Sequence, residues 1–288
     1  MKKVAIVSRM HLEKHEKTFH SVVRYLKKEG KEMFLEERVA KLMGLKKYKE
    51  FIPGETEVDL IIVMGGDGTI LRIVSKMKDI NCKFFGINMG HLGFLSEIPP
   101  VQIGKTLGRI FAGHYTIDKR MMLQIDLERN KKKIKQFHAL NEVSVTQGTL
   151  SRLITLKTKV DGKKLANYRS DGLIVATPTG STAYNLSAGG PIVYPTMKAM
   201  IITPICPHSF NQKPIVIPDN KKVSVLVASD YETINLTIDG QRSLLVQNGD
   251  IIHVKRGASV EFIRLPKESY FQTLRKKLGW GGKVEKLY

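Results

Sequence analysis

Residues 60–69 read LIIVMGGDGT and combine three features of an α/β fold. The run LIIVM is continuously apolar, as in a strand that is buried in a parallel sheet. GGDGT follows directly, and behind it Ile70, Leu71, Ile73 and Val74 recur at helical spacing. The pattern therefore predicts a buried strand, a glycine-rich turn and the start of a helix.

The predicted turn has the composition of a phosphate-binding site. Glycine permits positive φ and lets a ligand approach the backbone closely, and successive N–H groups at a helix N-terminus attract anions. A carboxylate among phosphates repels them unless it has a task, and Asp67 stands between the glycines. Two tasks fit: holding a divalent cation, or accepting the proton of an attacking hydroxyl. The alternative is a tight turn in which Asp67 only caps the helix.

Two common nucleotide-binding motifs are absent from the sequence. It contains no G-x-x-x-x-G-K-[ST] and no G-x-G-x-x-G after a predicted strand. The turn therefore differs from the usual P-loop and from the usual dinucleotide fingerprint.

Composition limits the classes of partner. The 288 residues carry a net charge of +20, which suits polyanionic ligands. The lysines are scattered and no basic stripe has interleaved aromatic side chains, so we expect no nucleic-acid partner. No apolar run approaches the roughly 18 residues of a membrane span, and the N-terminal run is too short for a signal peptide. We therefore expect a cytoplasmic protein with no membrane partner, in which Cys82 and Cys206 are reduced and buried.

Strands and helices alternate through residues 1–116. Apolar runs predict strands, and helical spacing with end signals predicts helices. This alternation predicts a doubly wound α/β domain, in which ligands lie at the carboxyl ends of strands. GGDGT and a second glycine-bearing loop, residues 88–94, both follow such ends. The further strands are expected at residues 4–7, 33–35 and 83–87, and the further helices at about 11–28, 36–43 and 103–111.

The pattern changes to a period of two over residues 117–265. Leu123, Ile125 and Leu127 alternate with polar residues, which indicates a half-buried antiparallel strand. Asp-Gly pairs at 161–162 and 239–240 predict hairpin turns. This half is therefore expected to be an all-β, sandwich-like domain. Its other strands are expected at residues 154–160, 173–176, 223–227, 234–238, 251–254 and 260–265.

A short C-terminal helix is expected within residues 266–288. Its apolar residues are Phe271, Leu274 and Leu278. A single helix cannot belong to a sandwich core, so we expect this tail to return to the α/β domain and complete it.

Further motifs connect the two halves to one family. Residues 141–142 read NE, 177–191 read TPTGSTAYNLSAGGP, 239–241 read DGQ and 274–280 read LRKKLGW. Together with GGDGT and in this order, they look like an NAD kinase. Diacylglycerol-type kinases share the glycine turn but not the TPTGSTAY run. The likeness extends over most of the chain and is weakest in the first forty or so residues.

The resemblance implies an activity. Members of the family transfer a phosphoryl group from ATP, or from polyphosphate, to the 2′-hydroxyl of the adenosine ribose of NAD, which gives NADP. Mg²⁺ or another divalent ion would screen the donor phosphates, with no metal site fixed by the protein. A homodimer or homotetramer is implied as well. The rival hypotheses are a lipid or sugar kinase that uses the same glycine turn, and a dinucleotide sensor without turnover.

The resemblance also implies roles for individual residues. Asp67 falls on the catalytic base, and the donor phosphates would lie on Gly65, Gly66, Gly68 and Thr69. Composition alone leaves Asn141–Glu142 as a polar pair at a strand edge, Tyr184 as a core aromatic and Asp239 as a turn residue. The NAD-binding residues implied by the family are Gly68, Phe94, Asn141, Glu142, Arg169, Asp171, Thr179, Thr182, Ala183, Tyr184, Ser187 and Gln241.

Overall fold

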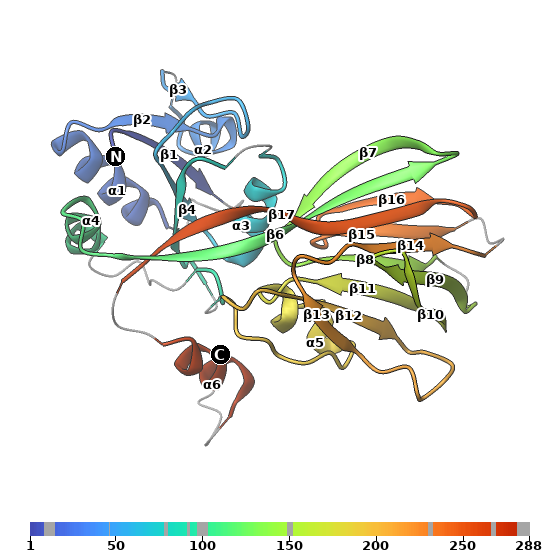
Figure 1. Ribbon diagram of the computed structural model, residues 1–288. Coiled ribbons are helices and arrows are strands. Elements are labelled where there is room, and N and C mark those ends of the chain that lie inside the picture. The colour runs from blue at the N-terminus through green and yellow to red at the C-terminus, as the bar shows by residue number, and fades with distance from the viewer. Residues whose placement is uncertain are drawn as a thin grey trace. The chain divides into compact units, whose positions relative to one another are not determined.

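A computed structural model describes residues 1–8, 15–45, 47–77, 80–90, 93–96, 103–148, 152–229, 233–265 and 269–280 (Figure 1). The chain divides into two compact units. Unit 1 comprises Met1–Lys119 and Val260–Tyr288, and unit 2 comprises Arg120–Ser259. Two long strands, β6 (Thr116–Arg129) and β17 (Ile251–Arg264), contribute residues to both units.

Unit 1 is built on a parallel sheet in the order β3-β2-β1-β4-β5. The end of β17 continues it, parallel to β5. Every residue of β4 is buried, which explains its unbroken apolar sequence. The strand order reverses between β1 and β4, so the predicted doubly wound topology is confirmed. The strands are β1 (Lys3–Ser8), β2 (Glu32–Leu35), β3 (Lys49–Glu50), β4 (Leu60–Met64) and β5 (Lys83–Ile87).

Helices cover both faces of this sheet. Side chains of α1 (Glu16–Lys28), α2 (Glu37–Leu42) and α4 (Ile103–Phe111) share one core cluster with alternate residues of β1 and β4. α3 (Asp67–Val74) covers the other face, since a Cβ added at Gly86 of β5 would lie 3.4 Å from Ile70 Cδ1. Figure 1 shows α1 and α4 together and α3 apart from them. The expected beginning of α1, from residue 11 to 14, lies outside the described residues.

An ion pair joins three elements of unit 1 at the carboxyl end of the sheet. Arg72 of α3 donates to both carboxylate oxygens of Glu36, which precedes α2, with 2.8 Å between Nη2 and Oε2. The same Nη2 donates to the carbonyl of Ser8, at the end of β1, over 3.1 Å. The side chains of Arg72 and Glu36 are only 18% and 11% exposed. Desolvation strengthens their attraction and makes the loss of one partner costly.

Unit 2 is a sandwich of two antiparallel layers. One layer has the order β13-β12-β11-β8-β15-β16, and the other contains β10-β9-β14-β17 with β6 and β7. Both layers contribute to one apolar cluster, and along β9 Ile154 and Leu156 are buried while Lys157 and Lys159 are exposed. The expected β-rich domain is therefore confirmed. Its remaining strands are β7 (Lys132–Ala139), β8 (Glu142–Gln147), β9 (Ile154–Val160), β10 (Lys163–Ser170), β11 (Gly172–Ala176), β12 (Ala199–Ile205), β13 (Ile215–Pro218), β14 (Val223–Val227), β15 (Ile234–Ile238) and β16 (Arg242–Val246).

Two expectations for the second half are wrong. The strands expected at residues 251–254 and 260–265 are one strand, β17, which runs through Gly257. A Cβ at Gly257 would lie 3.1 Å from the backbone nitrogen of Gln124, so glycine serves the close approach of β6 rather than a turn. Cys206 is exposed at a positive φ of 43°, whereas Cys82 is buried as expected.

The C-terminal helix α6 (Tyr270–Leu278) returns to unit 1, as predicted. It begins with a capping box of Ser269 and Gln272 and ends at Gly279, whose φ is 67°. The Tyr270 ring lies 6.4 Å from the ring of Phe94, and Lys277 Nζ lies 5.2 Å from that ring.

The apolar face expected for α6 is partly wrong. Phe271 is 60% exposed, whereas Leu274 is buried as expected and Thr273 is buried next to it. No helix among the described residues has the length and apolar character needed to cross a membrane.

The Arg72–Glu36 pair gives a stability prediction. Glu36→Ala leaves a largely desolvated guanidinium without its carboxylate, so the free energy of unfolding should fall by about 3 kcal/mol. Urea unfolding followed by circular dichroism measures the change. Glu37→Ala is the matched control, because its ion pair with Lys41 is exposed to solvent and contributes little to stability. Equal losses in the two variants would contradict the importance of the pair.

Candidate functional site

The glycine turn lies where it was expected, at the carboxyl end of β4. The Gly65 N–H donates to the Ile87 carbonyl at the end of β5 over 3.0 Å, and α3 begins at Asp67 with Gly66 as its N-cap. The turn and the loop after β5 therefore lie side by side at one edge of the sheet. Backbone N–H groups of the first turn of α3 are directed toward this edge.

The reason for glycine in the turn differs from the expectation. None of Gly65, Gly66 and Gly68 has a positive φ, because the strand passes into the helix through ordinary backbone conformations. A Cβ at Gly65 would lie 2.5 Å from Thr69 Oγ1, so Gly65 is required by packing. A Cβ at Gly66 or Gly68 would have no described atom within 4 Å. These two glycines border space that a ligand can occupy.

Asp67 does not cap its own helix; its carboxylate binds the loop after β5. Oδ2 accepts from the Phe94 N–H over 2.7 Å. Oδ1 accepts from the N–H groups of Leu95 and Ser96 and from Ser96 Oγ, each over 3.1 Å. The helix-cap alternative is therefore wrong. A carboxylate oxygen has two acceptor positions, and Oδ2 uses one of them toward the described residues, so it can accept a further hydrogen bond.

The loop that holds Asp67 is fixed from its other side as well. Arg264 at the end of β17 donates to the carbonyls of Leu95 over 3.0 Å and Phe94 over 3.3 Å. Its Nε donates to Asp118 over 3.1 Å. Gly93 makes room for the carboxylate, because a Cβ there would lie 2.0 Å from Asp67 Oδ1. Residues 91–92 of the expected loop lie outside the described residues.

The Asn141–Glu142 segment of unit 2 is held by Asp239. The Asp239 carboxylate accepts the N–H groups of Leu140, Asn141 and Glu142 over 2.8, 2.7 and 3.0 Å. The Asp239 N–H in turn donates to the Glu142 carbonyl over 2.9 Å. Asp239 has a positive φ of 49° and Gly240 one of 62°, which confirms the expected Asp-Gly turn.

The TPTGSTAY run packs directly on the same segment. Thr177 donates through its N–H to the Asn141 carbonyl over 2.8 Å and through Oγ1 to the Leu140 carbonyl over 2.6 Å. Thr177 Oγ1 also accepts the Gly180 N–H over 3.0 Å. A Cβ at Gly180 would lie 2.2 Å from the Asn141 carbonyl oxygen, so only glycine fits there. The structure thus brings two of the predicted motifs together.

The end of this run is tied to β12 by Asn185, which is fully buried. Its amide nitrogen donates to the carbonyls of Ser181 and Pro191, both over 3.2 Å, and its oxygen accepts from Thr203 Oγ1 over 2.7 Å. A Cβ at Gly190 would lie 2.1 Å from Asn185 Oδ1. Residues 180–191 therefore form an ordered loop with a defined backbone.

Two buried carboxylates lie next to each other at this segment. Glu142 and Asp239 are 6% and 4% exposed. Burial, followed by the charge of Asp239, raises the pKa of Glu142 to about 8. Burial raises the pKa of Asp239 to about 6, against the opposing effect of its three N–H partners. Near neutral pH Glu142 is therefore mostly protonated, and its Oε2 is buried with no hydrogen-bond partner among the described residues.

The remaining predicted residues lie at several places in unit 2. In the register of β8 and β11, Glu142 pairs with Ala176 and Thr146 with Gly172. Asp171 is therefore separated from the Glu142 end by about 16 Å of strand, and Arg169 precedes it on β10. Tyr184 is 42% exposed, so the core interpretation of its ring is wrong. Thr179 is buried and accepts from Arg120, Thr182 and Ala183 are half-buried, and Ser187 and Gln241 are exposed.

Tyr184 lies close enough to both Asp171 and Glu142 for their charges to affect its pKa. Burial of its hydroxyl and then the charges of Cys206, Asp171 and Glu142 raise its pKa. The tyrosine therefore stays neutral at physiological pH and can donate a hydrogen bond.

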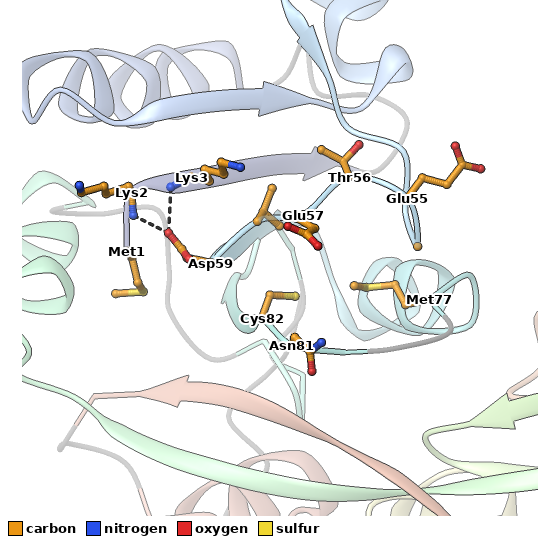
Figure 2. A pocket seen from close by; sticks show the side chains of 12 residues that line it. Met1, Lys2, Lys3, Glu55, Thr56, Glu57, Asp59, Met77, Asn81 and Cys82 are labelled. Atoms are coloured by element: carbon orange, nitrogen blue, oxygen red, sulfur yellow. Dashed lines mark hydrogen bonds between the residues drawn. The ribbon is translucent and has the colours of Figure 1, made fainter.

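A separate cavity of about 810 Å³ lies at the amino ends of the unit 1 strands, opposite the end that carries the glycine turn (Figure 2). Its lining residues stand at the amino ends of β1, β4 and β5. There Asp59 accepts the Lys3 N–H over 3.0 Å. Burial raises the pKa of Cys82 to about 12, so this thiol is not a nucleophile. Among the described residues, no group of three or more His, Cys, Asp or Glu side chains lies close enough together to hold a metal ion.

Sequence reasoning missed three residues that build these sites. Ser96, Asp239 and Thr177 act on partners 29, up to 99 and 37 residues away. Asp239 is expected as a turn residue within the DGQ motif, with no binding role assigned to it. The Asp-Gly turn signal is local, and no local signal identifies the backbone that the carboxylate binds.

Comparison with known proteins identifies the family. The family model of the ATP-NAD kinase N-terminal domain matches residues 4–115, and that of the C-terminal domain matches residues 140–265. Together with the relatives described next, these matches show that the chain belongs to the NAD kinase family.

Similar sequences and structures extend over nearly the whole chain. An NAD kinase of Thermoanaerobacter sp. strain X514 is 38% identical over 96% of this chain and 99% of its own. An NAD kinase of Geobacter sulfurreducens is 36% identical over 98% of this chain and 99% of its own. A crystal structure of an NAD kinase from Archaeoglobus fulgidus in complex with ATP matches with a TM-score of 0.72 and 27% identity. The match covers 97% of this chain and 100% of the other. Yeast NADH kinase complexed with NADH has the same fold, with a TM-score of 0.90 and 24% identity. The match covers 98% of this chain and 89% of the other.

The raised pKa of Glu142 predicts how stability depends on pH. The unfolded chain loses the Glu142 proton near pH 4.5, whereas the folded protein keeps it until about pH 8. The folded state therefore binds more protons in this interval, and stability falls as pH rises through it. Between pH 6 and 8 the fall should be roughly 2 kcal/mol in the ligand-free protein.

Urea unfolding of wild type and Glu142→Gln at pH 6 and 8 measures this effect. The variant should lose less stability than wild type over the same interval, because its side chain does not titrate. Glu57→Gln, at an exposed position of unit 1, is the control. Identical pH dependence in wild type and Glu142→Gln would refute the assignment.

Proposed function

We propose that this chain transfers the γ-phosphoryl group of ATP to the 2′-hydroxyl of the adenosine ribose of NAD, with Asp67 as the base. A bond forms between the ribose 2′-oxygen and the γ-phosphorus, and the bond to the β–γ bridging oxygen breaks. The products are NADP and ADP, and the hydroxyl proton passes to Asp67. The observation that carries the proposal is a carboxylate at the start of α3, fixed by the loop after β5 and bordered by the open positions Gly66 and Gly68.

Unit 1 supplies the chemistry of the phosphoryl group. Phosphoryl transfer passes through a loose transition state, so positioning and charge screening account for most of the rate. The turn residues Gly65, Gly66, Gly68 and Thr69 would border the donor phosphates. The phosphates would lie at the open positions Gly66 and Gly68, because the N–H groups of Gly65 and Thr69 already donate to the carbonyls of Ile87 and Gly66. Asp67 Oδ2, which can accept one more hydrogen bond, would receive the 2′-hydroxyl, while the bonds to Oδ1 keep the carboxylate in place.

Unit 2 supplies recognition of the dinucleotide. Asn141 and Glu142 would bind the adenosine ribose and phosphate region, since Glu142 Oε2 is buried and can serve a ligand hydroxyl. The ordered TPTGSTAY loop would frame the bases. The residues assigned to NAD, with Gly68 and Phe94 of unit 1, are Asn141, Glu142, Arg169, Asp171, Thr179, Thr182, Ala183, Tyr184, Ser187 and Gln241.

A divalent ion and an oligomer complete the proposal. Mg²⁺ or a similar ion would reach the site on the donor phosphates, whose charge it screens. Polyphosphate offers the same chemistry as a donor. Asp171 and Arg169 lie a strand length from Glu142, which supports their use at a contact between subunits of a homodimer or homotetramer.

The rival functions differ in what they share with this chain. A lipid or sugar kinase shares the glycine turn, but the match of residues 140–265 to the ATP-NAD kinase C-terminal domain argues against that substrate class. A dinucleotide sensor would bind NAD without turnover, so detection of product distinguishes it.

Asp67→Asn tests the base assignment. Purified wild type with NAD, ATP and Mg²⁺ should form NADP, measured by an NADP-specific dehydrogenase. The variant should retain NAD binding and lose at least about 100-fold in turnover, because the amide cannot accept the proton. Turnover close to wild type would show that another group acts as the base.

Ser96→Ala separates the chemical role of Asp67 from its structural role. This variant removes one donor to Oδ1 and keeps the carboxylate. If Asp67 acts as the base, Ser96→Ala should retain turnover within about tenfold of wild type. Equal losses in both variants would mean that Asp67 serves only to hold the loop.

Gly93→Ala tests the placement of the Asp67 carboxylate. The added methyl group would lie 2.0 Å from Oδ1, so either the carboxylate or the loop must move. A displacement of about 1 Å at a reacting group can cost about 100-fold in turnover. Gly90→Ala, in the same loop, is the matched control, because its Cβ would meet no described atom within 4 Å. Steady-state kinetics of both variants should show a large loss in the first and a small one in the second.

A further inference from the structure

The turn between β15 and β16 contains a buried carboxylate that no assigned role uses. Asp239 is 4% exposed and lies at the first position of the Asp239-Gly240 turn. A hairpin turn of this sequence forms with its aspartate in solvent, so the turn alone does not explain the burial. Burying a carboxylate is costly unless it is hydrogen-bonded, and this one accepts three backbone N–H groups within 3.0 Å.

All three N–H groups belong to residues 140–142, directly before and at the start of β8. They include the backbone of both Asn141 and Glu142. The contact is reciprocal, because the Asp239 N–H donates to the Glu142 carbonyl over 2.9 Å. From the other side Thr177 and Gly180 pack against Leu140 and Asn141. The segment is therefore clamped between one carboxylate and the TPTGSTAY run.

The last residue of this segment, Glu142, has a buried carboxyl group. The residue is only 6% exposed, and its Oε2 has no hydrogen-bond partner among the described residues. A buried unsatisfied carboxyl oxygen is destabilising. A ligand hydroxyl or amide would supply the missing partner.

We propose that Asp239 is a positioning residue for the dinucleotide: its carboxylate fixes the backbone of residues 140–142 so that Asn141 and Glu142 are preorganised to bind the ribose of NAD. This inference rests on the proposed function. It assigns Asp239 no contact with the reacting atoms and no direct contact with the ligand. Preorganisation lowers the ordering cost of binding, so the role is expressed in affinity for NAD and less in turnover.

The test variant is Asp239→Asn. Asparagine is favoured in this turn, so the turn conformation is kept. The amide has one acceptor oxygen in place of two and turns an NH₂ group toward backbone N–H donors. We expect the dissociation constant of NAD, measured by calorimetry, and KM for NAD to rise by about tenfold to a hundredfold. KM for ATP and kcat should change by less than about threefold.

Asp161→Asn is the matched control. Asp161 also begins an Asp-Gly turn, with φ of 48°, and its N–H and carboxylate also bond backbone groups, those of Lys222 directly before β14. It differs in being exposed and in holding no predicted ligand residue. Its affinity for NAD should equal that of wild type. Its melting temperature should change less than that of Asp239→Asn, because the Asp161 carboxylate is exposed whereas that of Asp239 is buried with three N–H donors.

A pH profile separates positioning from a general structural role. Near Glu142, the titratable groups of the described residues that bear on it are Asp239 of the turn and Tyr184 of the short helix α5 (Tyr184–Ser187). Loss of the Asp239 charge lowers the pKa of Glu142, so the midpoint in the pH dependence of NAD binding should move to lower pH in Asp239→Asn. A mere loss of folded protein would leave this midpoint unchanged.

The outcomes separate the inference from the proposed function. NAD affinity within twofold of wild type in Asp239→Asn, or a loss of kcat with unchanged KM, overturns the inference. Failure of wild type to bind NAD or to form NADP overturns the proposed function instead. If Asp239→Asn does not fold, Asp239→Gly replaces it, because glycine accepts the positive φ and removes all three acceptor contacts. Unchanged NAD affinity in that variant overturns the inference equally.

Discussion

Hydrogen bonds from backbone N–H groups to a buried or half-buried aspartate are the interaction on which the candidate site of each unit depends. Asp67 holds residues 94–96, and Asp239 holds residues 140–142. A carboxylate accepts several donors at once, and its bonds to N–H groups are stronger than bonds between neutral partners. Each aspartate therefore converts a flexible connection next to a strand into a fixed backbone. The side chains proposed to meet the ligand are carried on that backbone.

The two aspartates use the same interaction for different purposes. Asp67 keeps an acceptor position on Oδ2, so it can serve both the loop and a reacting hydroxyl. Asp239 has its carboxylate turned toward backbone donors, and the neighbouring Glu142 carries the unused oxygen. Burial raises the pKa of Glu142 to about 8 and that of Asp239 to about 6. Near neutral pH Glu142 is therefore mostly protonated, which spares the segment the cost of two adjacent buried charges.

Much of the fold follows from the sequence because its signals are local. Continuous apolar runs identify the buried parallel strands β1, β4 and β5, and alternation identifies the half-buried strands of unit 2. The turns at Asp161 and Asp239 follow from residue type. Motifs shared with NAD kinases extend the prediction to the family, which the relatives confirm.

The errors arise where distant residues decide the outcome. Arg72 lies on the polar face of its helix by spacing, yet it is bound to Glu36, 36 residues away. Asp67 looks like a helix cap or a ligand group, and its actual protein partners are 27 to 29 residues further on. β17 continues through Gly257 because β6 comes close there, which no local pattern reveals. Sequence reasoning thus identified the turn and the segments, and tertiary contacts decide what each carboxylate binds.

The open space beside Gly66 and Gly68 has a consequence for how substitutions in this protein are screened. Alanine at Gly68 would meet no described atom and would favour the helix by about 1 kcal/mol. A selection for expression or heat resistance would therefore accept such a change, whereas a selection that requires a phosphate group on the turn would reject it. At Gly65 and Gly93 both selections would agree, because the empty protein itself has no room for a methyl group there. The contrast between the two kinds of glycine separates sequence constraints imposed by the ligand from those imposed by folding.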